Sequence, residues 1–431
     1  MPIRNEYSNE IKAGKKVKVV GWVHDIRDLG KLIFTILRDK EGQMQITAKK
    51  NETDEDIFNT IKKLNKEDLI KIEGICEKNE RAPGGVEIKP QKIEIIEKSA
   101  SPLPIELTGK IDSNIDRRFD WRFLDMRIKK NMDIFLLQNM ITDQFHTFMQ
   151  ENKFTRIFSS RINGAATEGG TEYFPIMYFN KEAFLAQSPQ LAKESVLASG
   201  LDRVYDIGFV YRAEPHHTTR HLCEYVSLDF EMVTDDMEEV MQMEEEFLKY
   251  CLKNLNKKAK HILDEYETTI SIPKKIPRIT LKEANKILKD MKVETDENDL
   301  TPDGEKAICK YVKKKYDEDF VYITEFPYKK KPFYIMKKEG SGPCHSFDLL
   351  YRGLEITSGG QREHRYDERV KNIKEKGIDP TTFDHMRFFK YGMPPHGGMG
   401  FGLERFTQMI LNLKNVREAT LMPRDPDRLI P

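Results

Sequence analysis

The chain has 431 residues, and its 71 Lys and Arg balance 71 Asp and Glu, so composition alone gives no sign of a nucleic-acid partner. Its length suffices for two or three domains, and it shows neither a signal-peptide pattern nor an apolar run of the roughly 20 residues that a membrane span needs. Five scattered cysteines without a C-x-x-C pair argue against a disulfide framework and a zinc site, so we expect a cytoplasmic protein.

The first hundred residues are predicted to form a small β-barrel. Turn formers separate five short apolar and β-branched runs, and a helical segment precedes the fourth run. Five strands with one helix at this place are typical of an OB fold, whose open face binds single-stranded nucleic acid; another small β-barrel is the alternative. The strands are expected at 17–23, 32–38, 43–47, 69–76 and 86–96, and the helix at 52–64.

A break at Pro102 and Pro104 ends this first domain, which we place at 1–104. Residues 105–130 are expected to form a hinge before a second domain at 131–431, which opens with a long amphipathic helix to about residue 152. A charged helical segment at about 236–320 is predicted to be an insertion in this domain, and a capping box from Thr280 to Glu283 opens one of its helices. No catalytic residue is predicted within the insertion.

Two predicted strands, at 204–210 and 225–231, flank the most informative motif. The segment between them contains Arg212, Glu214 and Arg220, and a glycine-rich turn near the C-terminus brings Arg405 to the start of a helix. Arginines, an aromatic ring and carboxylates on one polar sheet face suit a nucleoside polyphosphate and an amino group. The second strand alternates four of these side chains onto one face: Tyr225, Ser227, Asp229 and Glu231.

Together these segments resemble motifs 2 and 3 of the class II aminoacyl-tRNA synthetases, and their flanking residues resemble the aspartyl-tRNA synthetases of archaeal type. The resemblance implies an α+β fold, with an N-terminal OB-fold anticodon-binding barrel and a catalytic domain whose antiparallel β-sheet is flanked by helices. It implies an enzyme that activates L-aspartate with ATP and transfers it from aspartyl-adenylate to tRNA. It also implies a homodimer, although Ser160 stands where motif 1 normally has an interface proline.

The resemblance also implies how ATP is bound. Arg212 would contact the α-phosphate and the substrate carboxylate, and Glu214 would hold the adenine edge. Arg220 and Arg405 would grip the distal phosphates, and the adenine would stack between Tyr225 and Arg405. Arg212 and Arg405 are the predicted catalytic residues, because arginines held in place beforehand stabilise the charge of the α-phosphate transition state. The remaining predicted ATP contacts are His221, Leu222, Glu355, Gly402, Leu403 and Glu404.

Two carboxylates near residue 350 predict a magnesium site. Asp348 and Glu355 lie seven residues apart, and a turn at 352–353 between two strands would let both reach the same Mg²⁺. The Ser358 hydroxyl would complete the site, since Mg²⁺ prefers a few oxygen ligands together with phosphate and water.

The resemblance further implies a pocket for aspartate. Arg362 would pair with the substrate side-chain carboxylate, whose shape suits a guanidinium fork, and Lys193 would add a second cation. Asp229 would take the substrate ammonium with help from Gln190, and Glu168 would close over the substrate on a mobile loop. Arg212 and Ser358 complete the predicted aspartate contacts.

Three alternatives remain open. An asparaginyl-tRNA synthetase is disfavoured by Lys193 and Arg362, because two cations specify an acidic substrate. A non-catalytic nucleic-acid-binding paralogue is disfavoured because no arginine or metal carboxylate of the motifs is lost. A tRNA-independent amide-forming paralogue would have no use for the barrel.

Positions in the barrel are predicted to meet tRNA. Phe34 would stack on an anticodon base, and Gln45 and Glu87 would read base edges. Enzymes restricted to tRNA(Asp) tend to carry Trp and Lys where this chain has His24 and Pro83. The resemblance therefore favours a non-discriminating enzyme that charges both tRNA(Asp) and tRNA(Asn), with a discriminating enzyme as the alternative.

Overall fold

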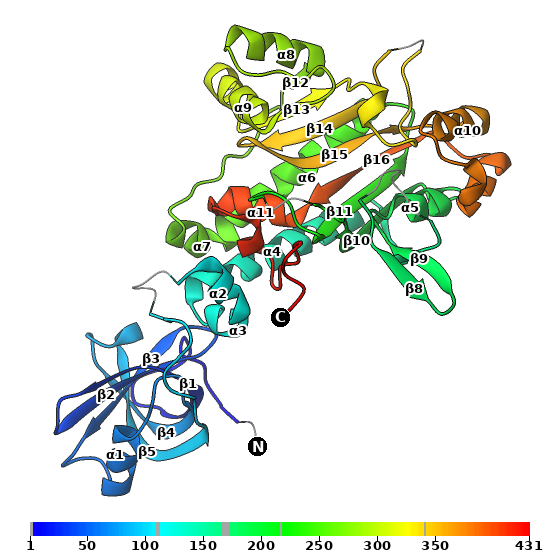
Figure 1. Ribbon diagram of the computed structural model, residues 1–431. Helices are drawn as coiled ribbons and strands as arrows, with labels where there is room; N and C mark the ends of the chain where they lie inside the picture. Colours follow the sequence, from blue (N-terminus) through cyan, green and yellow to red (C-terminus); the bar gives the residue numbers. More distant parts are fainter. Residues whose placement is uncertain (1–2, 109–112, 166–171, 216–217, 340–341) are drawn as a thin grey trace. The chain divides into compact units, whose positions relative to one another are not determined.

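The computed structural model describes residues 3–108, 113–165, 172–215, 218–339 and 342–431 (Figure 1). The chain divides into two compact units, 1–129 and 130–431. No helix in the described part of the chain is both long and apolar enough to cross a membrane.

The first unit contains a closed five-stranded barrel in the order β1-β2-β3-β5-β4, which confirms the predicted OB fold. Alternating apolar residues such as Ile33, Leu37, Met44 and Ile46 fill its interior, so the neighbouring residues on each strand face outward. The strands are β1 (Lys16–Asp28), β2 (Leu32–Arg38), β3 (Gln43–Lys49), β4 (Leu69–Lys78) and β5 (Val86–Glu97). The helices are α1 (Glu55–Lys62), η1 (Pro83–Gly85), α2 (Ile115–Asp120) and α3 (Arg122–Asp125).

The second unit is built on an eight-stranded sheet in the order β12-β13-β14-β15-β16-β11-β10-β6. The strands from β13 to β10 are antiparallel, as predicted, but both edge pairs, β12 with β13 and β6 with β10, are parallel. The strands are β6 (Thr155–Arg156), β10 (Arg203–Tyr211), β11 (Glu224–Val233), β12 (Arg278–Thr280), β13 (Phe320–Thr324), β14 (Ser346–Tyr351), β15 (Leu354–Arg362) and β16 (His396–Gly402). A separate small sheet contains β7 (Ile162–Asn163), β8 (Pro175–Tyr178) and β9 (Lys181–Leu185).

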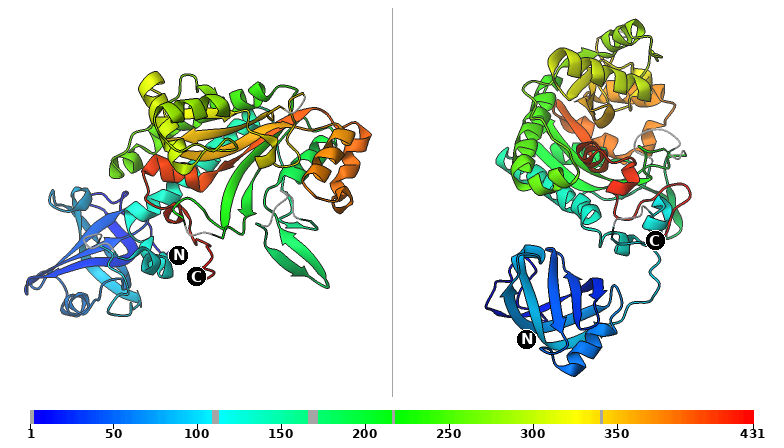
Figure 2. Two further views of the ribbon diagram at one scale, coloured as in Figure 1. Left: turned by 45° about the horizontal axis from the view of Figure 1, so that its top comes forward. Right: turned by 90° about the vertical axis from the view of Figure 1, so that its left-hand side faces the viewer.

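Two long helices, α4 (Lys129–Glu151) and α6 (Met237–Lys258), pack on this sheet (Figure 2). Phe145 of α4 and Phe247 of α6 meet edge to face, with ring centroids 5.1 Å apart, above apolar residues of β11 and β16. Leu228 and Phe230 of β11 belong to this core, so the intervening side chains of the strand face away from it. The other helices of this unit are α5 (Gln190–Leu197), α7 (Lys260–Glu265), α8 (Leu281–Asp290), α9 (Pro302–Tyr316), α10 (Tyr366–Glu375), α11 (Leu403–Leu411) and the short η2 (Tyr328–Lys330), η3 (Pro380–Thr382), η4 (Asp384–Tyr391) and η5 (Val416–Ala419).

The segment at 236–320 has two kinds of structure. Helix α6 belongs to the main core, whereas α8 and α9 share a smaller core with β13, in which Leu288 and Ile308 are fully buried. The predicted capping box is present, because Thr280 accepts from Glu283 N and Glu283 accepts from Thr280 N. Strand β12 extends the main sheet, so the segment is anchored to it.

Candidate active site

A cavity of about 650 Å³ in the second unit collects most of the predicted site residues. Ser227 and Asp229, on the face of β11 turned away from the helical core, form part of its wall. The lining also includes Gln190, Arg212, Glu214, Arg220, His221, Leu222, Tyr225, Asp348, Glu355, Ser358, Arg362, Gly402, Glu404 and Arg405. Residues predicted for ATP, metal and aspartate therefore share a single cavity.

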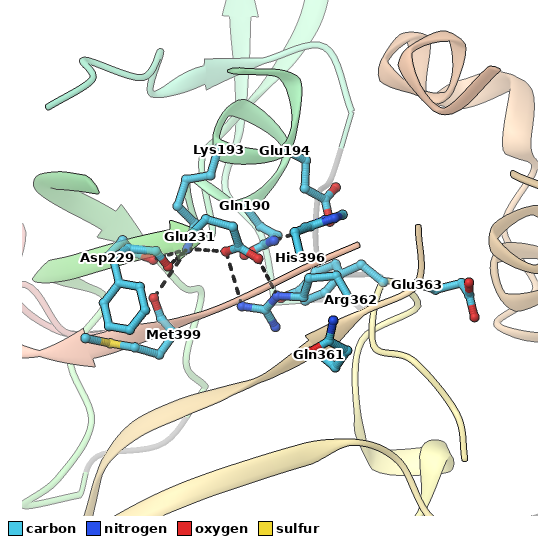
Figure 3. A network of polar contacts seen from close by, with 12 residues as sticks. Gln190, Lys193, Glu194, Asp229, Glu231, Gln361, Arg362, Glu363, His396 and Met399 are labelled. Carbon is cyan, nitrogen blue, oxygen red and sulfur yellow. Dashed lines mark hydrogen bonds and ion pairs between the residues drawn. The ribbon is translucent and has the colours of Figure 1, made fainter. Parts of the chain in front are cut away.

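A buried carboxylate, Glu231, links the two cations predicted for the substrate side chain (Figure 3). Arg362 Nε donates to Glu231 Oε1 over 2.8 Å, and Lys193 Nζ lies 3.1 Å from Glu231 Oε2. Burial by itself would raise the pKa of Glu231, but Arg362 and Lys193 hold it below its ordinary value. Glu231 is thus an ionised group that orients both cations. Sequence reasoning placed it on the correct strand face without assigning it a role.

The two cations differ in their access to the cavity. Arg362 lines the cavity, whereas Lys193 is 1 % exposed and lies behind its wall. Lys193 Nζ donates to Asp229 Oδ1 over 3.0 Å and to the Met399 carbonyl over 3.3 Å. The lysine therefore acts on the cavity mainly through its charge and through the positions of Asp229 and Glu231.

Gln190 is positioned by a second buried network, which sequence reasoning did not find (Figure 3). Gln190 Nε2 donates to Glu194 Oε1 over 3.3 Å, and Arg369 Nη2 donates to Glu194 Oε2 over 2.6 Å. His396 Nε2 lies 3.4 Å from Glu194 Oε1. Burial opposes ionisation of Glu194, yet Arg369 and His396 lower its pKa, so this carboxylate also stays charged.

The arginines predicted for the phosphates are linked through neighbouring backbone and side-chain groups. Arg405 Nε donates to the Arg220 carbonyl over 3.1 Å, and Arg405 Nη1 donates to the Glu355 carbonyl over 3.0 Å. Arg220 Nη2 lies 2.6 Å from both carboxylate oxygens of Glu305, a residue of α9 that sequence reasoning missed. Arg212 approaches the predicted adenine platform, with its guanidinium carbon 6.0 Å from the centre of the Tyr225 ring.

His221, beside these arginines, is kept neutral. Its Nδ1 lies 2.6 Å from the Thr218 hydroxyl. Burial, followed by the charges of Arg405 and Arg220, lowers the pKa of His221 to about 4. At neutral pH it therefore adds no positive charge to the cavity.

The predicted metal residues lie on one hairpin. Arg352 and Gly353 both have positive φ, 52° and 93°, and form the expected turn between β14 and β15. This turn brings Asp348 opposite Ser358 in the β14–β15 register. A Cβ at Gly353 would lie 3.1 Å from the Cα of Lys306 in α9, so the turn packs directly against that helix.

A lysine approaches the predicted metal carboxylates. Lys331 Nζ donates to both oxygens of Asp348, over 2.7 and 2.8 Å. Burial raises the pKa of Asp348 to about 6; Lys331 opposes this rise and the charge of Glu355 adds to it. The described residues contain no cluster of three or more His, Cys, Asp or Glu suited to a metal. Two carboxylates and a hydroxyl nevertheless fit Mg²⁺, which takes its other ligands from phosphate and water.

Two of the predicted ATP contacts are placed differently from the rest. Leu403 is buried in the main core, so only its backbone is available to a ligand. Glu404 borders the cavity, but its carboxyl accepts from Val226 N over 3.0 Å, and burial raises its pKa to about 8. Glu404 therefore has a clear structural role in tying α11 to β11. Glu168 lies outside the described residues.

The three residues predicted to meet the anticodon share one face of the barrel. Phe34 lies opposite Thr47 in the β2–β3 register, and Gln45 lies opposite Glu87 in the β3–β5 register. Phe34 is half-buried and does not belong to the barrel core. Gln45 Nε2 donates to Glu87 Oε2 over 3.1 Å. Burial opposes ionisation of Glu87, but hydrogen bonds led by that from Lys89 lower its pKa to about 2.

The two positions predicted to govern tRNA choice lie in irregular parts of the barrel. His24 is at a bulge in β1, where the register with β2 shifts, and Arg38 Nη1 lies 3.3 Å from its Nδ1. Arg38 in turn donates to the buried Glu67 over 2.8 Å. Pro83 opens the short η1 between β4 and β5.

Comparison with known proteins gives a consistent result. Residues 114–426 match the family of class II tRNA synthetases (D, K and N), and residues 17–96 match the OB-fold nucleic acid binding domain. The chain is 45% identical to the aspartate–tRNA(Asp) ligase of Pyrococcus abyssi and 41% identical to the aspartate–tRNA(Asp/Asn) ligase of Methanopyrus kandleri, covering 100% of each chain in both alignments.

Solved structures agree with this result. An asparaginyl-tRNA synthetase from Pyrococcus horikoshii, complexed with asparaginyl-adenylate, matches with a TM-score of 0.94 at 30% identity over 100% of both chains. A putative aspartyl-tRNA synthetase from Leishmania major matches with a TM-score of 0.89 at 29% identity, over 97% of this chain and 92% of that one.

Proposed function

Because the chain belongs to the class II tRNA synthetases (D, K and N), we propose that it is an aspartate–tRNA ligase. It activates L-aspartate with ATP, releases diphosphate, and transfers the aspartyl group from the adenylate to the 3′ end of tRNA(Asp). The observation that carries the choice of amino acid is Arg362, which borders the cavity and is oriented by the ionised Glu231.

The chemistry of Arg362 favours aspartate over asparagine. A guanidinium only donates hydrogen bonds, and the two oxygens of a carboxylate only accept them. The side-chain amide nitrogen of asparagine is also a donor, so it would face the N–H donors of Arg362 with no acceptor between them. Lys193 adds positive charge behind the wall, and Asp229 offers its carboxylate to the substrate ammonium. An asparaginyl-tRNA synthetase is therefore the weaker candidate, although a solved structure of one shares this fold.

We assign the activation step to the linked arginines. Arg212 and Arg405 place positive charge where the α-phosphate gains negative charge during attack by the substrate carboxylate. Tyr225 provides an aromatic face for adenine and Glu214 a carboxylate for its amino edge. Asp348, Glu355 and Ser358 would hold Mg²⁺, which when bound supplies charge neutralisation for the phosphates.

The barrel is the proposed anticodon reader. Phe34, Gln45 and Glu87 combine a stacking surface with a hydrogen-bond donor and an ionised acceptor, which suits unpaired RNA bases. His24 and Pro83 favour acceptance of both tRNA(Asp) and tRNA(Asn). Similar proteins carry both kinds of name, so they leave this choice to experiment.

We also propose a cytoplasmic homodimer. The five cysteines are free and buried, in keeping with a reducing compartment. Phe158, beside Ser160, and Met177 and Phe179, on the β8–β9 hairpin, are apolar side chains that remain largely exposed in the single chain. A second copy of the chain is the partner we assign to these residues, with Ser160 in place of the usual proline.

Aminoacylation with labelled aspartate, using separate tRNA(Asp) and tRNA(Asn) transcripts, tests the proposal. Charging of both is the expected result. Charging of tRNA(Asp) alone would keep the enzyme and refute the relaxed tRNA choice. Charging of neither, with labelled asparagine accepted instead, would overturn the role of Arg362.

A further inference from the structure

We propose that Glu305, on the inserted helix α9, is a positioning residue that holds the Arg220 guanidinium ready for the phosphates of ATP. The inference rests on the proposed function, because it takes Arg220 as a phosphate ligand. It gives a part in the reaction to a segment in which the sequence alone predicts no catalytic residue.

The contact between the two residues is close and shielded. Arg220 Nη2 lies 2.6 Å from both oxygens of Glu305, although 85 positions separate the residues in the chain. Their side chains are 16 % and 9 % exposed. Water screens such a pair only weakly, so the carboxylate restrains the guanidinium more firmly than a surface ion pair would.

Glu305 is itself held by the backbone. Its Oε2 accepts from Glu355 N over 3.1 Å, which ties it to the start of β15. Glu305 N donates to the Thr301 carbonyl over 2.9 Å in the first turn of α9. Beside it, the Gly353 turn packs against Lys306. Because α9 and the β14–β15 hairpin both hold Glu305, its carboxylate keeps its position when Arg220 moves.

The main chain of Arg220 is restrained as well, and one N–H donor of its guanidinium remains available for a ligand. Arg405 donates to its carbonyl, while Glu305 takes one end of its guanidinium. Arg220 Nε is buried and finds no hydrogen-bond partner within the described residues, although the side chain lines the cavity. A buried unsatisfied donor is costly, and a phosphate oxygen would satisfy it. The arrangement is that of an arginine oriented before its ligand arrives.

Glu305→Gln tests the inference, because it removes the charge and keeps the shape. Without the carboxylate, Arg220 must be ordered when ATP binds, so we expect the KM for ATP in ATP–pyrophosphate exchange to rise about tenfold. The KM for aspartate should stay within about twofold of the wild-type value. The matched control is Asp303→Asn in the same turn of α9, where the exposed carboxylate pairs with Lys306 and both KM values should remain unchanged.

A double variant separates positioning from a general packing role. If Glu305 acts through Arg220, then Glu305→Gln should add nothing to the ATP defect of Arg220→Gln. Additive defects, or an equal rise in both KM values, would overturn the inference. A lower KM for ATP would also overturn it, since the carboxylate would then compete with phosphate. If Glu305→Gln does not fold, Glu305→Asp keeps the charge on a shorter side chain and should raise the KM for ATP by a smaller factor, whereas an unchanged value would count against the inference.

Direct titration of the protein with ATP distinguishes a failure of this inference from a failure of the proposed function. Wild-type protein that binds ATP but shows no aspartate-dependent exchange would refute the choice of amino acid. In that case weaker ATP binding by Glu305→Gln than by Asp303→Asn would still support the positioning role, and equal binding would refute it.

Discussion

Two arginines that line the same cavity, Arg362 and Arg220, are each paired with a buried carboxylate, and the two pairs are held in different ways. Glu231 has two cations, Arg362 and Lys193, which keep its pKa below the ordinary value despite full burial. Glu305 has Arg220 as its hydrogen-bonded cation, and burial raises its pKa to about 7. The first pair joins strands β11 and β15, whereas the second joins the segment after β10 to helix α9.

The two pairs suit different tasks in the cavity. To choose an amino acid, the cavity needs a fixed pattern of charge. The ion-paired side chains of Glu231, Arg362 and Lys193, from β11, β15 and α5, provide one. Binding phosphates needs an arginine that is held in place but still has a donor for the ligand. Glu305 holds one end of the Arg220 guanidinium, while Arg220 Nε has no hydrogen-bond partner within the described residues.

Removing Arg362 should have the largest effect on activity. Arg362→Leu takes away the substrate partner and one of the two cations on Glu231, so kcat/KM for aspartate should fall about 1000-fold, or about 4 kcal/mol. Steady-state ATP–pyrophosphate exchange measures the loss. Arg365→Leu is the control, because Arg365 is about half exposed and pairs with Glu363. A loss below tenfold for Arg362→Leu would show that the strand-borne pair does not select the substrate.

Neutralising the two carboxylates compares the pairs directly. Glu231→Gln leaves Lys193 and Arg362 without their shared anion and should lower the free energy of unfolding by about 3–5 kcal/mol. Glu305→Gln should leave it unchanged or raise it by about 1 kcal/mol, because at pH 8 the folded chain keeps ionised a carboxylate whose pKa burial raises to about 7. Urea unfolding at pH 8 gives both values, and equal losses would show that the two carboxylates are held in the same way.

A third buried carboxylate, Glu244, extends the comparison to a site that has no ion pair with another described residue. Glu244 accepts from the Tyr322 hydroxyl over 2.9 Å, and burial raises its pKa to about 7. The folded chain therefore keeps a proton that the unfolded chain has lost, and stability falls as pH rises from about 4.5 through 7. Relative to Glu244→Gln, the wild type should lose about 3 kcal/mol between pH 4.5 and pH 8. Parallel pH curves for the two proteins would contradict this.

A smaller effect on activity than that of Arg362→Leu should come from the barrel, where Phe34 lies opposite Thr47 and shares a face with Glu87. Phe34→Ala should raise the KM for tRNA about tenfold, because stacking on a base contributes about 1–3 kcal/mol. Aspartate-dependent exchange without tRNA should not change. Leu29→Ala, an exposed apolar residue at the β1–β2 turn, is the control. A defect in adenylate formation would show that the anticodon face and the cavity are not independent.

Local sequence patterns predicted most of the strands, and the resemblance to class II synthetases predicted most of the site residues that the cavity collects. Period-two alternation placed Tyr225, Ser227 and Asp229 along one wall, and the expected turn at Arg352–Gly353 brought the two carboxylates predicted for a metal onto one hairpin. These features depend on neighbours in the chain, so spacing is enough to find them.

Partners from distant segments were not predictable in this way. Glu305 reaches Arg220 across 85 positions, and Lys331 reaches Asp348 from the segment after η2. The parallel edges of the sheet also depend on where distant strands come to lie. Glu231 is the intermediate case. Its strand face followed from alternation, but its two cations come from α5 and β15, and only the assembled fold brings them together.

The close approach at Gly353 limits how this chain can be recombined with its relatives. A Cβ there would lie 3.1 Å from the helix backbone at Lys306, so the β14–β15 hairpin and α9 act as matching surfaces. A chimaera that exchanges the inserted segment must therefore carry its own version of this turn, or one that leaves the same room. Exchanging α9 without the turn at Gly353 would separate two segments whose shapes must match.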